Sequence, residues 1–252
     1  MNTELLNWSI LGPAIVAGLL VLSTHVPLGQ EVLKRGIIFI DLAIAQIAGL
    51  GVLLAGVFGW EENIWLVQAS AISAALLASA LLHWTEKRWP ESQEPLIGTL
   101  FVLAATGSIL LLAGNPHGAE HLKDLLVGQI LWVTWEMLIP VALLYAVLLT
   151  AWFKWRDHFG STGFYVIFAF VVTASVQLVG VYLVFSSLII PALATRRLHG
   201  KSRLLVGYSL GAFAFVTGIM LSALFDLPTG AATVWTMALL ALVAGGWLGR
   251  SR

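Results

Sequence analysis

The sequence predicts an all-α, polytopic membrane protein with about eight to nine transmembrane helices. Hydrophobic residues occupy 59% of the 252 positions, charged residues only 10%, and the mean hydropathy is +0.93. A soluble domain carries about a quarter charged residues. The chain has no cysteine, which excludes disulfides and thiolate metal sites, and its net charge of zero gives no support for nucleic-acid binding. We therefore expect one transmembrane domain over residues 1–252, with the lipid bilayer as its surroundings.

Apolar segments of spanning length follow one another along the whole chain. A helix of about 20 residues crosses the hydrocarbon core of a bilayer. The first segment has no basic stretch in front of it, so we expect a membrane span there and not a signal peptide. The predicted spans are residues 8–28, 36–58, 64–83, 95–114, 133–153, 163–180, 181–195, 204–224 and 228–248.

The two segments that meet at Gly180 could form one long tilted helix or two short crossings. With two crossings and the N-terminus outside, twelve of the thirteen Lys and Arg residues lie on the cytoplasmic side, and only Lys123 lies outside. With a single helix, the basic loops divide about evenly between the two sides. The positive-inside rule therefore favours a broken pair, with Gly180 and Pro191 as helix breakers. Such breaks are common where transporters bind or couple.

Asp41 is the most informative polar residue, because it is ionisable and lies inside the apolar run 36–60. A charged side chain at the bilayer centre costs about 2.5–3.5 kcal/mol on insertion scales, so it usually faces a polar pathway or a partner. Gln46 follows five residues later, about 140° away on a regular helix. A π-bulge between them would bring both side chains onto one face. We predict that Asp41 and Gln46 line a polar pathway through the membrane.

Two further polar residues are candidates for the same pathway. Gln177 lies three residues before Gly180 and could line the path, or it could make an interhelical hydrogen bond. Asp226 begins the last outer turn before Pro228 and could receive the substrate from outside, or it could cap a helix end.

One outer loop holds three metal-ligating side chains within five residues. If the loop is helical, their i, i+3 and i+4 spacing could form a weak site for a divalent metal, although polar residues are also ordinary in loops at a membrane interface. The three residues are His117, Glu120 and His121.

No nucleotide-binding or hydrolytic motif is present. The sequence contains no Walker A pattern, no dinucleotide-binding glycine motif and no HExxH pair. We expect no enzymatic activity and no permanently bound cofactor. Energy for active transport must then come from another polypeptide or from an ion gradient.

Five blocks of residues carry a resemblance to a known family. The most specific reads GVYLVFSSLIIPALATRR and covers residues 180–197. In these blocks the chain resembles the integral-membrane permease of bacterial zinc and manganese uptake ABC importers. The other blocks are residues 27–51 (Pro27-Leu28-Gly29 through Asp41 to Gly51), 84–98 (the 84–88 linker leading into Leu96-Ile97-Gly98), 124–136 and 222–230.

The resemblance implies a homodimeric permease in the bacterial inner membrane that passes a divalent metal ion, zinc or manganese, into the cytoplasm. It also implies two ATPase subunits on the cytoplasmic face and an extracytoplasmic metal-binding protein. The segment around Pro191, Arg196 and Arg197 would couple the permease to the ATPase. These two arginines could equally be charges that fix the topology at a helix end.

Two departures from the family pattern leave the substrate open. The family usually has a histidine four residues after the membrane aspartate, where this chain has Ala45, and Gln46 is one residue out of step. A glutamine carbonyl suits manganese better than zinc. The connection at residues 154–163 is also shorter than in the family. The alternatives are a permease for a metal chelate or other small solute, and a membrane assembly or sensor subunit without transport activity.

Overall fold

The computed structural model describes residues 8–113, 115 and 118–250, and within them the chain is helical, with no strand. Two short 3-10 turns, η2 (Pro90–Ser92) and η3 (Ile130–Trp132), join longer helices. The helices are α1 (Trp8–Arg35), α2 (Ile40–Val57), α3 (Ile64–Arg88), α4 (Gln93–Leu112), α5 (Gly118–Val127), α6 (Trp135–Val179), α7 (Val181–Ala194), α8 (Gly200–Phe225) and α9 (Thr229–Arg250).

The predicted fold class, a polytopic α-helical membrane protein, is confirmed. The apolar helix α7 (Val181–Ala194) is shorter than a full span, and α9 is apolar over Thr229–Ala244. Seven described segments are long and apolar enough to cross a membrane: Trp8–Arg35, Ile40–Val57, Ile64–Arg88, Pro90–Leu112, Trp135–Lys154, Gly160–Val179 and Gly200–Phe225.

Two glycines interrupt the helices in the second half of the chain. Gly160, with φ 54° and ψ −139°, makes a kink that divides α6 into two spans. Gly180, with φ 79° and ψ 163°, separates α6 from α7, as the sequence predicted. Both conformations lie in a region that glycine adopts without steric cost. Pro191 is not a breaker, since it lies inside α7, which continues to Ala194. A proline removes a single backbone hydrogen bond, and that loss falls in the last turn of α7.

The chain folds into two compact units, and each is built from separate stretches of sequence. Unit 1 comprises Met1–Arg35, Val127–Tyr145 and Leu178–Arg252, and unit 2 comprises Gly36–Leu126 and Ala146–Gln177. The expectation of a single domain over residues 1–252 stays a prediction.

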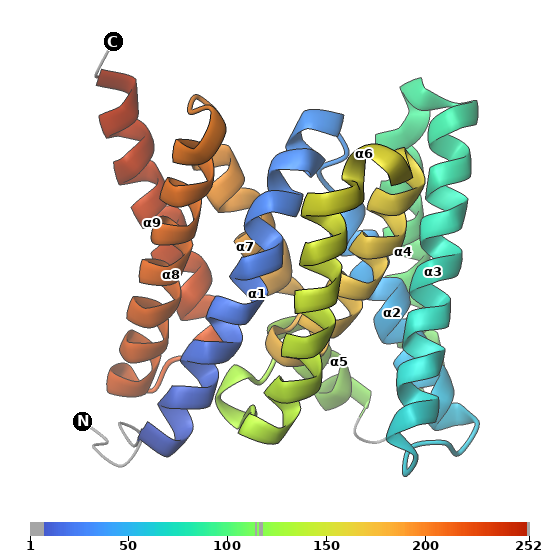
Figure 1. Ribbon diagram of the computed structural model, residues 1–252. Coiled ribbons are helices and arrows are strands. Elements are labelled where there is room, and N and C mark those ends of the chain that lie inside the picture. The colour runs from blue at the N-terminus through green and yellow to red at the C-terminus, as the bar shows by residue number, and fades with distance from the viewer. Residues whose placement is uncertain (1–7, 114, 116–117, 251–252) are drawn as a thin grey trace. The chain divides into compact units, whose positions relative to one another are not determined.

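In unit 1, α1, α7, α8 and α9 pack together through close backbone contacts (Figure 1). At Gly29 of α1, an added Cβ atom would lie only 2.0 Å from the carbonyl oxygen of Leu188 in α7. At Gly218 of α8, it would lie 2.5 Å from the Cα atom of Thr233 in α9. Small residues at such points allow membrane helices to approach closely. The block that begins at Pro27 and the 180–197 block therefore contact each other at Gly29.

A second junction in unit 1 brings the start of the 180–197 block together with two further resemblance blocks, 124–136 and 222–230. Gly128 follows α5 and has φ 73°, and a Cβ atom there would lie 2.2 Å from the carbonyl oxygen of Val179. A Cβ atom at Gly180 would lie 2.3 Å from the backbone nitrogen of Gly128. At Gly230, in the first turn of α9, it would lie 2.5 Å from the carbonyl oxygen of Val127. Backbone from three distant parts of the sequence thus meets with no room for side chains.

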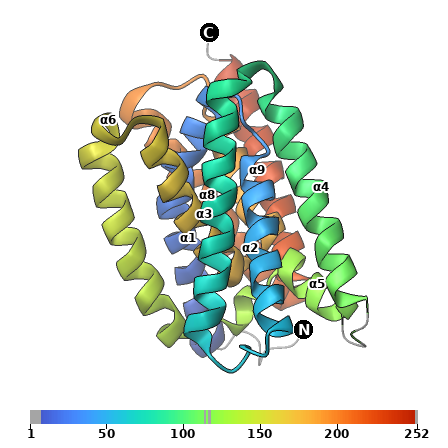
Figure 2. The same cartoon turned by 90° about the vertical axis from the view of Figure 1, so that its right-hand side faces the viewer.

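In unit 2, α2 lies between α3 and α4 (Figure 2). Ser70 of α3 donates a hydrogen bond from its hydroxyl to the carbonyl oxygen of Gly51 in α2, at 2.6 Å. Gln93, at the start of α4, is buried and donates to the carbonyl oxygen of Leu82 at 2.9 Å and to the Tyr165 hydroxyl at 3.3 Å. Thr85 donates to the Gln93 amide oxygen at 3.1 Å. These bonds connect α3, α4 and α6 at the helix ends near residue 90.

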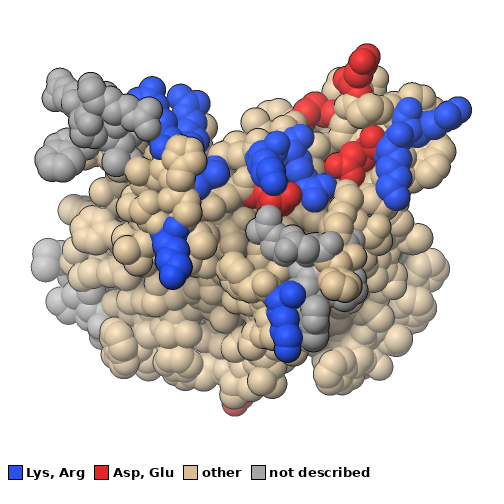
Figure 3. All heavy atoms as spheres, turned by 45° about the horizontal axis from the view of Figure 1, so that its top comes forward, with Lys and Arg blue, Asp and Glu red and all other residues tan. Residues whose placement is uncertain are grey.

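Charged side chains gather at helix ends. In Figure 3, most of the visible Lys and Arg lie toward the ends that the view brings forward, with Asp and Glu among them, and the surface below is mostly uncharged apart from two basic groups. In unit 1 this end holds the last residues of α1 and the connection from α7 to α8, and its basic residues are Lys34, Arg35, Arg196, Arg197, Lys201 and Arg203. The sequence predicts that this end faces the cytoplasm.

Candidate metal pathway site

Asp41 is the second residue of α2 and is fully buried, with 0% of its surface exposed. The chain leaves α1 at Gly36, where a positive φ of 72° turns the backbone. A short turn follows, in which the Ile40 N–H donates to the carbonyl oxygen of Ile37 at 3.3 Å. The carboxylate of Asp41 therefore lies at the N-terminal end of a helix, where the helix dipole favours a negative charge.

The Asp41 carboxylate has no protein partner among the described residues. Neither Oδ1 nor Oδ2 makes a hydrogen bond of standard geometry, although the backbone N–H groups of Asp41 and Leu42 lie near enough to stabilise its charge. No ion pair of Asp41 is found in this part of the chain. A buried charge without a partner is strongly unfavourable, so this position needs a cation or a proton.

Glu94 is a second carboxylate at the same place in unit 2. It lies in the first turn of α4, and its Oε1 accepts a hydrogen bond from the Ile38 N–H, just before α2. Its Oε2 atom is buried and has no partner among the described residues. Glu94 is close enough to Asp41 for their charges to repel each other. Sequence reasoning missed Glu94 because the predicted span began at Pro95. The signal was a carboxylate directly in front of a span.

Gln46 is nearly buried, with 5% exposure, on the same helix as Asp41. The π-bulge considered from the sequence is absent, because α2 is a regular α-helix from Ile40 to Val57. Asp41 and Gln46 therefore project about 140° apart around the helix axis. The structure does not bring these two side chains onto one face, and a pathway role for Gln46 stays a prediction.

Gln177 lies near the end of α6 and pairs with Gln68 of α3. The Gln177 amide donates to Gln68 Oε1 at 3.1 Å, and the Gln68 amide donates in return to Gln177 Oε1. Gln177 is exposed on the surface of the single chain. This reciprocal pair is the interhelical hydrogen bond that the sequence offered as the alternative. A pathway role for Gln177 stays a prediction.

Asp226 ends α8 in unit 1 and is exposed. It has φ 53° and ψ 44°, the left-handed conformation that aspartate tolerates better than most residues. Beside it, the Ser222 hydroxyl donates to the carbonyl oxygen of Leu227 at 2.6 Å and contacts the Thr229 hydroxyl at 2.6 Å. Asp226 thus forms the tight turn between α8 and α9, at the C-terminal end of a helix. A role in receiving metal stays a prediction.

The predicted outer cluster falls largely outside the described residues. His117 lies outside them, and the His121 side chain is not described. Glu120 is exposed in the first turn of α5. Among the residues that were searched, no group of three His, Asp or Glu residues could hold a metal ion.

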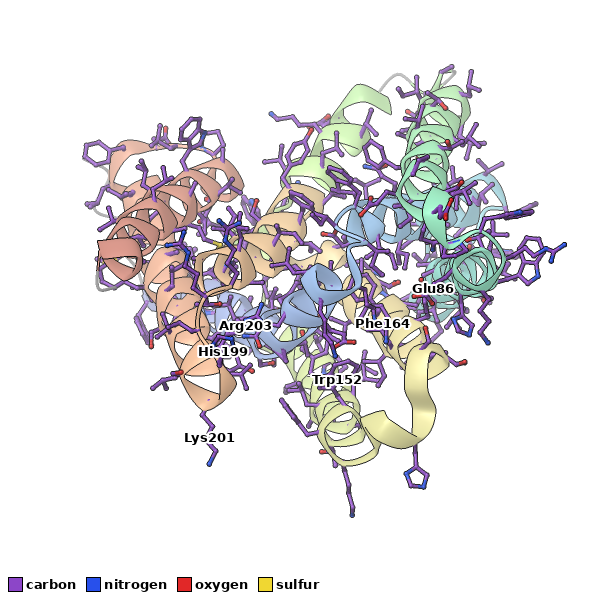
Figure 4. The ribbon with its side chains drawn as sticks, turned by 90° about the horizontal axis from the view of Figure 1, so that it is seen from above. Glu86, Trp152, Phe164, His199, Lys201 and Arg203 are labelled. Carbon is purple, nitrogen blue, oxygen red and sulfur yellow. The ribbon has the colours of Figure 1, made fainter. Side chains whose placement is uncertain are left out.

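The residues predicted to couple the permease to the ATPase lie in the last turn of α7 and in the connection from α7 to α8. Pro191 is buried, and its carbonyl oxygen accepts hydrogen bonds from the Thr195 backbone N–H at 3.1 Å and hydroxyl at 2.7 Å. These bonds end α7, and Arg196 and Arg197 follow, both exposed. Figure 4 shows Lys201 pointing away from the start of α8, near His199 and Arg203. The connection is a short, exposed basic segment.

A comparison with protein-family models matches nearly the whole chain to the ABC 3 transport family, over residues 7–164 and 158–246. The chain belongs to the ABC 3 transport family. The resemblance read from the sequence blocks is therefore confirmed.

Similar curated proteins and a solved structure agree with this family. The chain is 24% identical over 254 residues to the high-affinity zinc uptake system membrane protein ZnuB of Haemophilus influenzae, covering 92% of this chain and 95% of that protein. It is 26% identical over 255 residues to the manganese transport system membrane protein MntC of Halalkalibacterium halodurans, covering 92% and 85%. Its fold matches PsaBC from Streptococcus pneumoniae in complex with Fab, with a TM-score of 0.78, 22% identity and coverage of 97% and 95%.

Proposed function

We propose that this ABC 3 family member is the permease subunit of an ATP-binding-cassette importer that moves a divalent metal ion, zinc or manganese, into the cytoplasm. The membrane would be the bacterial inner membrane. Two relatives that align with nearly the whole chain are named for zinc and for manganese transport. The same two metals follow from the resemblance of the sequence blocks.

The burial of the Asp41 carboxylate without a protein partner is the observation that supports this proposal most directly. A fully buried, ionised carboxylate without a protein partner is unfavourable until a cation or a proton neutralises it, and a metal ion passing through the membrane can be that cation. A pathway site must bind an ion strongly enough to admit it and weakly enough to release it. A carboxylate that makes no ion pair of its own meets the first need, because no protein cation has to be displaced when the metal arrives.

Oxygen ligands favour manganese over zinc at this position. Zinc sites in proteins use histidine and cysteine more than oxygen, whereas carboxylate and carbonyl oxygens suit manganese. This chain has no cysteine, and Ala45 stands where the family usually has a histidine. We infer that the permease passes manganese more readily than zinc.

The transport cycle would need three partners. Cytoplasmic ATPase subunits would contact the exposed Arg196 and Arg197, with the α7 end held by Pro191. An extracytoplasmic binding protein would deliver the metal near Asp226, and a second copy of the chain would complete the path. The permease itself would not be an enzyme, since its sequence contains no Walker A motif.

The experiment is metal uptake in a bacterial host that lacks its own zinc and manganese importers. The host receives this permease with the ATPase and binding protein encoded beside it, and cell metal is measured by mass spectrometry. We expect restored accumulation of manganese, and its loss in the Asp41→Asn variant, which keeps the shape of the side chain but removes the charge. Glu62→Gln, at an exposed carboxylate between α2 and α3, is the matched control and should transport normally.

Two outcomes would contradict the proposal. If the wild-type complex restores accumulation of neither manganese nor zinc, the chain is not a metal importer. If Asp41→Asn transports as well as Glu62→Gln at equal amounts of protein in the membrane, Asp41 is not on the path.

A further inference from the structure

We propose that Glu94 is a second metal ligand, and that Asp41 and Glu94 together bind one divalent cation at the N-terminal end of α2. This inference rests on the proposed function and extends it to a residue outside the sequence predictions. Where the family usually has an aspartate and a histidine on one helix, this chain would use two carboxylates from neighbouring helices.

The two carboxylates come from helices that pack directly against each other in unit 2. Asp41 lies in the first turn of α2 and Glu94 in the first turn of α4. The Ile38 N–H binds Glu94 Oε1 and so positions that side chain against the segment that leads into α2. Helix packing therefore determines the separation of the two carboxylates, as a binding site requires.

Three buried carboxylate oxygens at this place lack hydrogen-bond partners within the described part of the chain. They are Asp41 Oδ1, Asp41 Oδ2 and Glu94 Oε2. Buried polar atoms are nearly always paired in folded proteins, so three orphans in two neighbouring side chains indicate an absent partner. All three atoms are acceptors when the carboxylates are ionised, and acceptors of this kind bind a cation.

The charge at this place also specifies the kind of cation. Two adjacent carboxylates repel each other, and neither makes an ion pair with a lysine or arginine among the described residues. One divalent cation neutralises both charges, whereas a single monovalent cation leaves one negative charge buried. Carboxylate oxygens are ligands that Mn²⁺ accepts readily. The geometry thus favours the same cargo as the proposed function.

Glu94 has a competing structural role, because its Oε1 atom accepts the hydrogen bond from the Ile38 N–H. The Glu94→Gln variant separates the two roles. A glutamine keeps an oxygen that accepts this hydrogen bond, but it removes the negative charge. A purely structural Glu94 would therefore be replaced by glutamine without consequence, whereas a metal ligand would not.

The test measures Mn²⁺ binding to the full-length permease in lipid nanodiscs, from the electron paramagnetic resonance signal of free Mn²⁺. Wild type, Glu94→Gln and Asp41→Asn are compared with Glu91→Gln, an exposed carboxylate three residues before Glu94. We expect Glu94→Gln to weaken Mn²⁺ binding at least about tenfold, the lower end of the loss seen when groups supporting a metal site are removed. Asp41→Asn should weaken binding as much or more, and Glu91→Gln should bind as wild type does.

The results distinguish failure of this inference from failure of the proposed function. If Asp41→Asn abolishes binding and Glu94→Gln binds as wild type does, Glu94 is structural and the inference is wrong, while the importer proposal stands. If the wild-type permease binds no Mn²⁺ in nanodiscs, the joint site is wrong, and uptake in cells still decides the proposed function.

A second measurement needs no variant and covers the case in which Glu94→Gln does not fold. Dicyclohexylcarbodiimide labels buried carboxylates, and mass spectrometry of the digested wild-type protein locates the label. We expect Mn²⁺ to protect Asp41 and Glu94 together over one concentration range, with Glu91 unprotected. Protection of Asp41 alone would overturn the inference.

Discussion

The helices inside unit 1 and the helices inside unit 2 are joined by different kinds of contact. In unit 1, helices touch through glycines whose neighbours leave no room for a methyl group, as at Gly29 and Gly218. In unit 2, buried polar side chains connect the helices, with Gln93 at the centre of one such network. Unit 2 also has a close glycine contact, at Gly51 against Ser70, but the network around Gln93 makes it sensitive to lost polarity as well. The unpartnered carboxylate of Asp41 belongs to unit 2, the unit that holds this network.

The largest effect on stability is expected from Gly29→Ala in unit 1. The new methyl group would lie 2.0 Å from the backbone oxygen of Leu188, which cannot move without moving α7. Overpacking of this kind costs about 1–3 kcal/mol. We expect a lower yield of folded protein and earlier thermal unfolding in detergent, measured by fluorescence-detected size exclusion.

Gly98→Ala is the matched control for this variant, because Gly98 lies in a helix of unit 2 with no heavy atom within 4 Å of the added methyl group. Alanine should be neutral or stabilising there, since it favours the helix by up to about 1 kcal/mol over glycine. Equal unfolding temperatures for the two variants would show that α1 and α7 are not in tight contact.

A smaller loss is expected from Gln93→Leu in unit 2, because leucine has a similar size but no polar atoms. The change leaves the carbonyl oxygen of Leu82 and the Thr85 and Tyr165 hydroxyls without this partner. Leaving a buried polar group unpaired costs about 1–3 kcal/mol, part of which the Thr85 hydroxyl offsets by donating to Leu82. Thermal unfolding measures the effect. If Gln93→Leu melts no earlier than Gln129→Leu, an exposed control, polar contacts do not hold unit 2 together.

The smallest effect is expected from the Gln68 and Gln177 pair. Hydrogen bonds between membrane helices average about 0.6 kcal/mol, so the coupling from Gln68→Leu, Gln177→Leu and the double variant should stay under about 1 kcal/mol. Metal uptake by the same variants then shows whether Gln177 has a role beyond this contact. If Gln177→Leu is stable and transports normally, the pair is a structural contact, whereas a selective loss of uptake would place Gln177 on the pathway.

The sequence by itself determined the fold class, the approximate spans and the break at Gly180. It also singled out Asp41 as an ionisable residue inside an apolar span. Hydrophobic length and backbone hydrogen bonding are local requirements in a bilayer, so they can be read along the chain. The limit of that reading is visible in α1, which extends to Arg35 although the predicted span ended at residue 28. Hydropathy marks the hydrocarbon core, whereas helical hydrogen bonds continue past it.

Only the tertiary structure decided which residues meet. It placed Glu94 beside Asp41, paired Gln177 with Gln68 and brought Gly29 against Leu188. Each contact joins helices far apart in the sequence, and its partner depends on how the helices rotate and pack. An apolar pattern shows that a helix is in the membrane, but it does not identify the neighbour of any one face. The sequence shows a carboxylate directly in front of a span at Glu94, but its place beside Asp41 could be recognised only after α2 and α4 were seen packed together.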